Sequence, residues 1–252
     1  RYISEPGSAK NIERYLEDYA HPVIVFFFIY SESFVFYTGS SEFFAPALRY
    51  DRSATERNAR ELAEQARALD ADAIVAVGAG KLADTAKNVA ELLNVDLIMV
   101  PTCAAYTPFS VNYDDEHRYV GSPLHGRNSV AMIVDSALIS RAPAEKMVGG
   151  IGDTIAKWYE CAPVLERAND LTAFDQLAYQ SARLIHDILL EHSEDALKAL
   201  HAGDYDNEQV RLLIDTIIGL AGTVGGLGCE RARVSGAHAL HNGLTQVPGS
   251  AA

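Results

Sequence analysis

Short apolar runs that alternate with a helical segment constrain the fold of the first half of this sequence. Ala73–Val77 and residues 97–100 are apolar, bounded by polar or turn residues, and short enough for buried strands. Residues 84–93 lie between them and have helical spacing. The run at residues 22–30 is also strongly apolar. It is too short to cross a membrane, so it is predicted to be a buried strand. This order of strands and helices predicts a parallel α/β sheet.

A further helix is predicted over residues 53–69, between the first two of these strands. Ser53 and Glu56 have the spacing of a capping box, in which a hydroxyl and a carboxylate bind each other's backbone N–H. Apolar residues then recur at helical spacing: Ala59, Leu62, Ala63, Ala66 and Leu69.

The character of the sequence changes near Asp135. Helices are predicted over residues 151–165, 171–190, 207–224 and 235–244, and we find no convincing strand after Ser136. The segment 142–152 is the predicted boundary. We therefore expect an α/β domain over residues 1–141 and an all-α domain over residues 142–252.

Composition restricts the classes of partner. The 252 residues are 48% hydrophobic and carry a net charge of −13, which argues against nucleic acid and against an anionic membrane surface. No signal peptide or transmembrane stretch is visible, and the three cysteines form no CxxC pair, so we expect a reducing cytoplasm. Apolar helical positions serve a homo-oligomer interface or a core equally well: Leu212, Ile214, Ile217 and Ile218.

The segment from Val77 to Lys87 follows a predicted strand and opens a predicted helix. It contains Gly78 and Gly80, whose small size lets a backbone approach an anion at a helix N-terminus, so it suits a pyrophosphate. It matches neither the GxGxxG nor the GxxxxGK[ST] pattern. An ordinary tight turn explains the segment, taken alone, equally well.

Three further stretches add specificity: VPT at residues 100–102, GIGDTIAKWYE at 150–160 and HALHNGLT at 238–245. Taken together and in this order, the motifs resemble the iron-containing (group III) alcohol dehydrogenase superfamily. The likeness is to its glycerol dehydrogenase and hydroxycarboxylate dehydrogenase branch, and it runs from about residue 73 to residue 245. It implies a dehydroquinate synthase-like fold, with an NAD(P)-binding α/β domain, a helical metal domain and an active site in the cleft between them.

The resemblance also implies which residues bind NAD or NADP. The pyrophosphate would lie at the glycine turn, and the nicotinamide would lie beside the proline–threonine turn and the segment after it. The matching positions are Gly78, Gly80, Lys81, Leu82, Ala83, Asp84, Thr102, Thr107, Phe109 and Tyr113. Asp84 also suits a helix N-terminus, and Phe109 and Tyr113 also suit ordinary core packing.

In this family one aspartate and two histidines bind zinc or iron, and Asp153 and His238 match the aspartate and the first histidine. The resemblance implies that the metal polarises the substrate carbonyl while the nicotinamide delivers hydride. His241 lies three residues after His238, on the same helical face, and is a candidate proton relay or a polar supporting residue. The other histidines are expected at the surface, or packed in the case of His186.

The sequence departs from the family pattern at four places. No second metal histidine follows the HALHNGLT stretch, which leaves two of three expected protein ligands, and the helical domain is expected to be incomplete at its C-terminus. The segment between Thr102 and Cys103 is a few residues short. Cys103 replaces an aspartate of the glycerol dehydrogenases, which favours a 2-oxo or 2-hydroxy acid over a polyol. Residues 26–41 match the family poorly, and Glu32 is no more than a candidate for the acid that binds the adenosine ribose, so NAD and NADP both stay open.

The function predicted from the sequence is a metal-dependent NAD(P) dehydrogenase for a small 2-oxo or 2-hydroxy acid or a polyol. One alternative is a sugar-phosphate or glycerol-phosphate enzyme of the same scaffold, which would need a phosphate pocket. The basic residues available for such a pocket are few: Lys157, Arg167, Arg183, Lys198, Arg211, Arg231 and Arg233. The other alternative is a metal-free, non-catalytic truncated relative.

Overall fold

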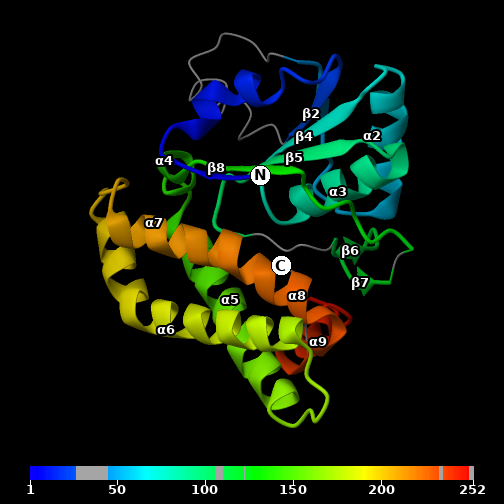
Figure 1. The fold of residues 1–252 in the computed structure, drawn as a ribbon. Coiled ribbons are helices and arrows are strands. Elements are labelled where there is room, and N and C mark those ends of the chain that lie inside the picture. The colour runs from blue at the N-terminus through cyan, green and yellow to red at the C-terminus, as the bar shows by residue number, and fades with distance from the viewer. Residues whose placement is uncertain (27–44, 106–109, 122, 233–234, 250–252) are drawn as a thin grey trace. The chain divides into compact units, whose positions relative to one another are not determined.

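The computed structural model describes residues 1–26, 45–105, 110–121, 123–232 and 235–249. The chain divides into two compact units. Unit 1 comprises Arg1–Thr102 and Phe109–Leu138, and unit 2 comprises Cys103–Pro108 and Ile139–Ala252. Figure 1 shows that unit 1 contains the sheet and that unit 2 is helical in its described residues. The α/β and all-α composition expected from the sequence is therefore confirmed.

Unit 1 is built on a six-stranded sheet with the order β1-β8-β5-β4-β2-β3, in which every neighbouring pair is parallel. The strands are β1 (Tyr2–Ser4), β2 (Pro22–Phe26), β3 (Ala47–Arg49), β4 (Ala73–Val77), β5 (Asp96–Val100) and β8 (Ala131–Val134). The chain passes from β2 outward to β3 and then returns to β4 on the other side of β2. This reversal is a topological switch point, where ligands of open α/β sheets usually bind at the carboxyl ends of the strands.

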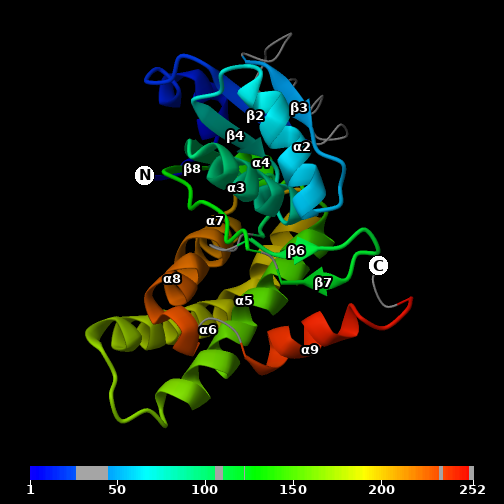
Figure 2. The same ribbon diagram turned by 90° about the vertical axis from the view of Figure 1, so that its right-hand side faces the viewer.

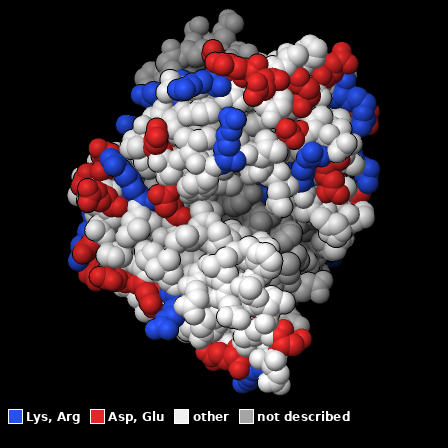
Figure 3. Space-filling view, viewed as in Figure 1, with Lys and Arg blue, Asp and Glu red and all other residues white. Residues whose placement is uncertain are grey.

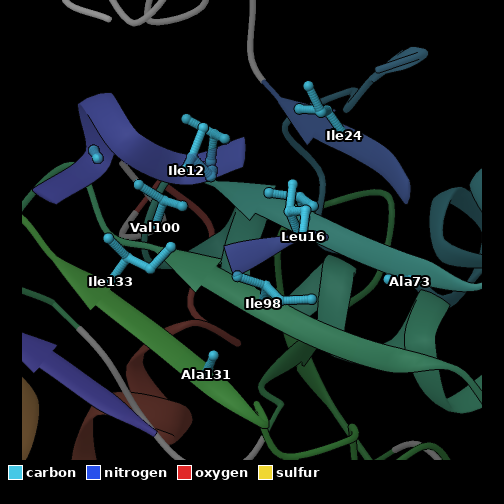
Figure 4. Close-up of a cluster of buried hydrophobic side chains, with 11 residues drawn as sticks. Ile12, Leu16, Ile24, Ala73, Ile98, Val100, Ala131 and Ile133 are labelled. Atoms are coloured by element: carbon cyan, nitrogen blue, oxygen red, sulfur yellow. The ribbon is translucent and has the colours of Figure 1, made fainter. Parts of the chain in front are cut away.

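Helices cover the sheet of unit 1 on both faces. Alternate strand residues such as Ile24, Ile98 and Ile133 pack under the 3-10 helix η1 (Ser8–Tyr15) together with Ile12 (Figure 4). The intervening strand residues are also fully buried, and α3 (Lys81–Leu93) packs on β4 and β5 with α2 (Glu56–Arg67) beside it (Figure 2). This burial on both sides explains why the strands are continuous apolar runs.

Most of the predicted elements of unit 1 are present, but the predicted capping box is wrong. Thr55 caps α2 by accepting a hydrogen bond from the Asn58 N–H, whereas the Ser53 hydroxyl binds Asp51 and Thr55. Ala54 has a left-handed backbone (φ 53°), so the chain turns once more between Ser53 and the helix. Residues 27–30 of the predicted first strand lie outside the described residues.

Five short strands of unit 1 were not predicted from the sequence. They are β1, β3 and β8 of the main sheet, together with the antiparallel pair β6 (Asn112–Tyr113) and β7 (Tyr119–Val120). Strands of two to four residues contain too few side chains to show a period of two. β1, β3 and β8 form because neighbouring strands of the main sheet supply their hydrogen-bond partners, whereas β6 and β7 pair with each other.

Unit 2 consists of helices: α4 (Ser136–Ile139, which begins in unit 1), α5 (Ala144–Leu165), α6 (Ala173–His201), α7 (Glu208–Asp215), the π-helical segment η2 (Thr216–Leu220), α8 (Ala221–Ala232) and α9 (Gly236–Leu244). α5 begins seven residues earlier than predicted. Glycines normally weaken a helix, but Gly150 lies so close to Ala104 that an added Cβ would collide with the Ala104 carbonyl oxygen. Gly150 therefore marks a close contact within the helix instead of its start.

The segment Glu208–Leu227 is long and apolar enough to cross a membrane by length and composition alone, but half of it is buried within the protein. Its apolar face, which includes Ile214, Ile217 and Ile218, is almost fully buried next to α5 and α6. Ile214, Ile217 and Ile218 are therefore core residues of unit 2, whereas Leu212 is partly exposed, so the choice between core and subunit interface is resolved for these three residues only.

Candidate functional site

The glycine turn of unit 1 joins β4 to α3 at the carboxyl edge of the sheet. The Gly78 N–H donates to the Val100 carbonyl at 3.0 Å, which ties the start of the turn to the neighbouring strand β5. An added Cβ on Gly78 would lie 2.9 Å from the Leu82 side chain, so the turn needs a small residue there. Gly80 has φ 55° and ψ −127°, a conformation that residues with a Cβ avoid. Both glycines predicted from the sequence are thus required by the geometry of the turn.

The N-terminus of α3 fits the phosphates of a dinucleotide. Its cap residue, Gly80, has no side chain, and α3 starts without a side-chain cap. The first turn of such a helix presents backbone N–H groups and the positive end of the helix dipole to an anion. Leu82 and Ala83 are buried, so they can contribute only their backbone N–H groups. The Lys81 ammonium lies 4.7 Å from the centre of the Tyr113 ring and adds positive charge to this helix terminus.

Asp84 does not point out of the turn but into the unit, where it binds Lys87. The Lys87 Nζ donates to Asp84 Oδ1 at 3.1 Å, and the side chains are 0% and 9% exposed. Burial raises the pKa of Asp84 and lowers the pKa of Lys87, and the charge of each partner partly offsets this effect in the other. The carboxylate of Asp84 is therefore a structural partner of Lys87 and holds the first turn of α3.

Thr102 follows β5 at the same carboxyl edge as the glycine turn, because Val77 and Val100 are paired in the sheet. Thr102 is partly exposed, as the predicted contact with a nicotinamide requires. Burial and the nearby charge of Asp84 raise the pKa of Tyr113, which keeps its phenol neutral. The predicted contacts Thr107 and Phe109, and the candidate acid Glu32, lie outside the described residues.

Unit 2 brings together Asp153 and His238, the two predicted metal ligands, from α5 and α9. His238 Nε2 lies 3.3 Å from Asp153 Oδ1 (the two helices are shown in Figure 2). Two ligands of a tetrahedral zinc, each about 2.0–2.1 Å from the metal, are themselves about 3.3 Å apart. The spacing and the chemistry of this donor pair therefore fit a divalent metal. Among the described residues no group of three or more His, Cys, Asp or Glu side chains is arranged to hold one.

Two further side chains of α5 hold this donor pair. Lys157 is buried, and its Nζ donates to Asp153 Oδ2 at 3.2 Å, which leaves Oδ1 directed toward His238. Glu160 is also buried and lies 2.6 Å from His238 Nδ1 through its Oε2. Glu160 lies within the GIGDTIAKWYE motif, but no role for it was predicted from the sequence. Its position seven residues after Asp153, two turns along one helical face, was the signal that could have identified it.

The pKa shifts of Asp153, His238 and Glu160 favour ionised carboxylates on both sides of the His238 ring. Burial raises the pKa of Asp153, but hydrogen bonds and charges from His238 and Lys157 outweigh burial and lower it to about 2. The hydrogen bond with Asp153 raises the pKa of His238; burial lowers it in part, and Glu160 raises it further. Burial raises the pKa of Glu160, but the N–H groups of His238 and Ser235 and the His238 ring lower it overall.

The remaining predicted residues have less specific surroundings. His241 is exposed on α9 one turn after His238, and its Nδ1 lies 3.4 Å from Asn242 Oδ1. Cys103 is a free, partly buried thiol, and burial raises its pKa while Lys146 partly lowers it, so the thiol stays neutral at ordinary pH. His186 packs against Trp158 and Tyr159, as expected.

Most of the described basic side chains that a phosphate pocket would need in unit 2 are paired with acids. Lys157 binds Asp153, and the surface ion pairs are Arg183–Asp187, Lys198–Glu194, Lys198–Asp195 and Arg211–Asp206. On the face drawn in Figure 3, the described lysines and arginines are interspersed with acidic side chains. This charge pattern gives the phosphate-enzyme alternative little support.

Comparisons with known proteins identify the family of the chain. Residues 40–143 match the family model of iron-containing alcohol dehydrogenases. Over 187 residues the chain is 38% identical to hydroxycarboxylate dehydrogenase A of Escherichia coli, which covers 71% of this chain and 50% of that protein. Over 183 residues it is 36% identical to glycerol dehydrogenase of Pseudomonas putida, with coverages of 69% and 48%.

A solved structure is also similar along nearly the whole chain. The probable glycerol dehydrogenase from Sinorhizobium meliloti matches with a TM-score of 0.85 and 27% identity, covering 98% of this chain and 70% of that one. The chain spans about half the length of the curated relatives it matches. The motifs, the two-unit fold and these similarities show that the chain belongs to the iron-containing alcohol dehydrogenase superfamily, in the branch of glycerol and hydroxycarboxylate dehydrogenases.

Proposed function

We propose that this chain acts in reversible hydride transfer between NAD(P)H and a small 2-oxo or 2-hydroxy acid, with polyols as the second substrate class. Unit 1 binds the dinucleotide, and unit 2 binds a divalent metal, zinc or iron. The observation that carries the proposal is the pair Asp153 Oδ1 and His238 Nε2, 3.3 Å apart. When bound, the metal would polarise the substrate oxygen, and the nicotinamide would supply or accept the hydride.

The residues of unit 1 bind and orient the cofactor in this proposal. The backbone N–H groups of Lys81, Leu82 and Ala83 receive the pyrophosphate, and Gly80 permits its close approach. Thr102, at the same edge of the sheet, is assigned to the nicotinamide end. The pair Asp84–Lys87 keeps the first turn of α3 rigid and contributes no charge to the phosphates, because both side chains are buried.

The residues of unit 2 provide the ligands and the proton. Lys157 holds one oxygen of Asp153, so that the other is available to a metal. His241 is exposed and can exchange a proton with water, which supports the role of proton relay. Cys103 is a neutral thiol and cannot bind polyol hydroxyls as a carboxylate would, so it supports a 2-oxo or 2-hydroxy acid as the substrate.

Cofactor and metal binding can be tested separately on protein stripped with a chelator. We expect zinc to stabilise the wild type by about 2.7 kcal/mol at 100 times its dissociation constant, and NADH or NADPH to show enhanced fluorescence on binding. Asp153→Asn should abolish the zinc effect and leave cofactor binding intact. Asp195→Asn makes the same chemical change at an exposed site on α6 and should alter neither.

The alternative of a metal-free, non-catalytic relative is favoured by one observation, namely that the described residues supply only two donors to the metal. Stripped wild-type protein that gains no stability from zinc or iron and binds neither dinucleotide would establish this alternative. Binding of a dinucleotide together with turnover of a 2-oxo acid that is lost on chelation would exclude it.

Cellular location and assembly follow as lesser parts of the proposal. Cys103 and Cys161 are free thiols, which is consistent with the proposed cytoplasmic location. The proposed homo-oligomer is supported by apolar side chains of α6 that are more than half exposed, such as Phe174 and Leu177. Sedimentation of the purified protein tests the oligomer directly.

A further inference from the structure

Glu160 is a buried carboxylate that forms three hydrogen bonds with the start of α9. Its Oε1 accepts from the backbone N–H of Ser235 at 2.9 Å and from that of His238 at 3.0 Å. Its Oε2 lies 2.6 Å from His238 Nδ1. Glu160 is only 5% exposed, so these bonds replace the water that a carboxylate would otherwise need.

The first two bonds make Glu160 the cap of α9. The cap residue Ser235 provides no side-chain hydrogen bond of its own. In a capping box the N–H groups of the cap residue and of the third helical residue are satisfied by side chains of the same helix. Here Ser235 and His238 hold these two positions, and the side chain of a different helix, α5, satisfies both. A negative charge is also favourable at a helix N-terminus.

The third bond fixes the ring of His238. A carboxylate can only accept a hydrogen bond, so Nδ1 donates to Glu160 and is not available as a ligand. Nε2 is then the nitrogen that a metal could bind, in place of the proton through which it hydrogen-bonds Asp153 in the metal-free protein. That nitrogen is the one that lies 3.3 Å from Asp153 Oδ1. Because Asp153 and Glu160 are seven residues apart on α5, the same helical face sets both the oxygen donor and the direction of the nitrogen donor.

We propose that Glu160 is a positioning residue that couples the docking of α9 to the presentation of His238 Nε2 beside Asp153. The proposal rests on the proposed metal site of unit 2 and adds a residue that is not itself a ligand. Carboxylates that orient ligating histidines typically contribute 10–100-fold to metal affinity. Glu160 has a second role besides orienting His238, because without it the first turn of α9 also loses its cap.

The test compares Glu160→Gln and Glu160→Ala with Glu166→Gln. Glu166 is the C-cap residue of α5, is exposed, and accepts a hydrogen bond from the Tyr179 hydroxyl, away from Asp153 and His238, so it is a matched control. Three quantities are measured on the full 252-residue chain. They are zinc affinity by chelator competition, the tautomer of His238 by ¹⁵N chemical shifts in metal-free alkaline buffer, and hydrogen exchange of the backbone amides at residues 235–238.

We expect zinc affinity to fall about 10–100-fold in Glu160→Ala and by less in Glu160→Gln, whose amide oxygen still accepts hydrogen bonds. In Glu160→Ala the neutral ring of His238 should lose its preference for a proton on Nδ1. The backbone amides of residues 235–238 should exchange faster. Glu166→Gln should match the wild type throughout. An unchanged tautomer in both Glu160 variants would overturn the proposal, whatever their zinc affinity and amide exchange.

Failure of the metal site itself is distinguishable from failure of this proposal. If wild-type protein binds no zinc, the proposed function fails, and Glu160 is judged on the tautomer and the amide exchange of metal-free protein alone. If wild-type protein binds zinc but neither Glu160 variant changes the tautomer, the role of Glu160 fails while the metal site stands.

Discussion

Replacing Lys87 by Met tests the buried ion pair beneath the glycine turn. Asp84 would keep its place in the core of unit 1 without the ammonium that lies 3.1 Å away, although the backbone N–H of Val111 still binds it. Removing one partner of a buried pair typically costs about 3–5 kcal/mol. An upper bound follows from protonation: neutralising a carboxyl of ordinary pKa 3.8 near pH 7 costs about 4 kcal/mol. We therefore expect Lys87→Met to lose about 3–4 kcal/mol of stability near pH 7.

The pH dependence provides a second signature of the same mechanism. In the variant the folded-state pKa of Asp84 is raised further above that of the unfolded chain, so the folded protein retains a proton that the unfolded chain releases. The deficit relative to wild type therefore grows as pH rises above about 4 and falls to about 1.6 kcal/mol near pH 5. Urea unfolding followed by far-ultraviolet circular dichroism at both pH values measures the deficit.

Two control variants separate the buried charge from other effects. Lys198→Met removes an exposed lysine that pairs with Glu194 and Asp195, and it should leave the stability nearly unchanged because water screens exposed ion pairs. The double variant Asp84→Asn, Lys87→Met has no buried charge and should recover most of the loss. If Lys87→Met costs no more than Lys198→Met, or if its deficit does not shrink near pH 5, the reasoning about a stranded carboxylate is wrong.

Three further predictions concern other parts of the chain. Gly80→Ala should cost about 1–3 kcal/mol of strain at φ 55° and abolish dinucleotide binding in a fluorescence titration, while zinc binding is retained. Gly150→Ala should destabilise unit 2 by about 1–3 kcal/mol, because its Cβ would collide with the Ala104 carbonyl; fluorescence of the single tryptophan during urea unfolding measures this. Burial and a hydrogen bond to Asp96 raise the pKa of Tyr19 to about 12. The stabilisation from this hydrogen bond is present below pH 10 and is lost as pH rises toward 12. Tyr19→Phe should therefore be about 1 kcal/mol less stable than wild type near pH 8, and the difference should vanish near pH 12.

The strands β2, β4 and β5 were predictable because each is a continuous apolar run bounded by turn residues, and a strand buried on both faces needs such a run. The capping of α2 was not predictable in detail. Ser53 and Thr55 both precede the helix, and only the left-handed turn at Ala54 decides that Thr55 is the cap. The start of α5 was misplaced because the effect of Gly150 depends on Ala104, a distant neighbour in the sequence.

The sequence alone predicted the parallel sheet and the glycine turn, because local patterns carry this information. The family resemblance of its motifs singled out Asp153 and His238, whose role as metal ligands stays a prediction. Tertiary structure decided what the other charged side chains do. Asp84 and Glu160 look alike in the sequence, as acids within helices, but packing directs one to Lys87 and the other to the start of α9. The physical reason is that a charge buried on folding must find its partner in space, and that partner is set by how the elements pack.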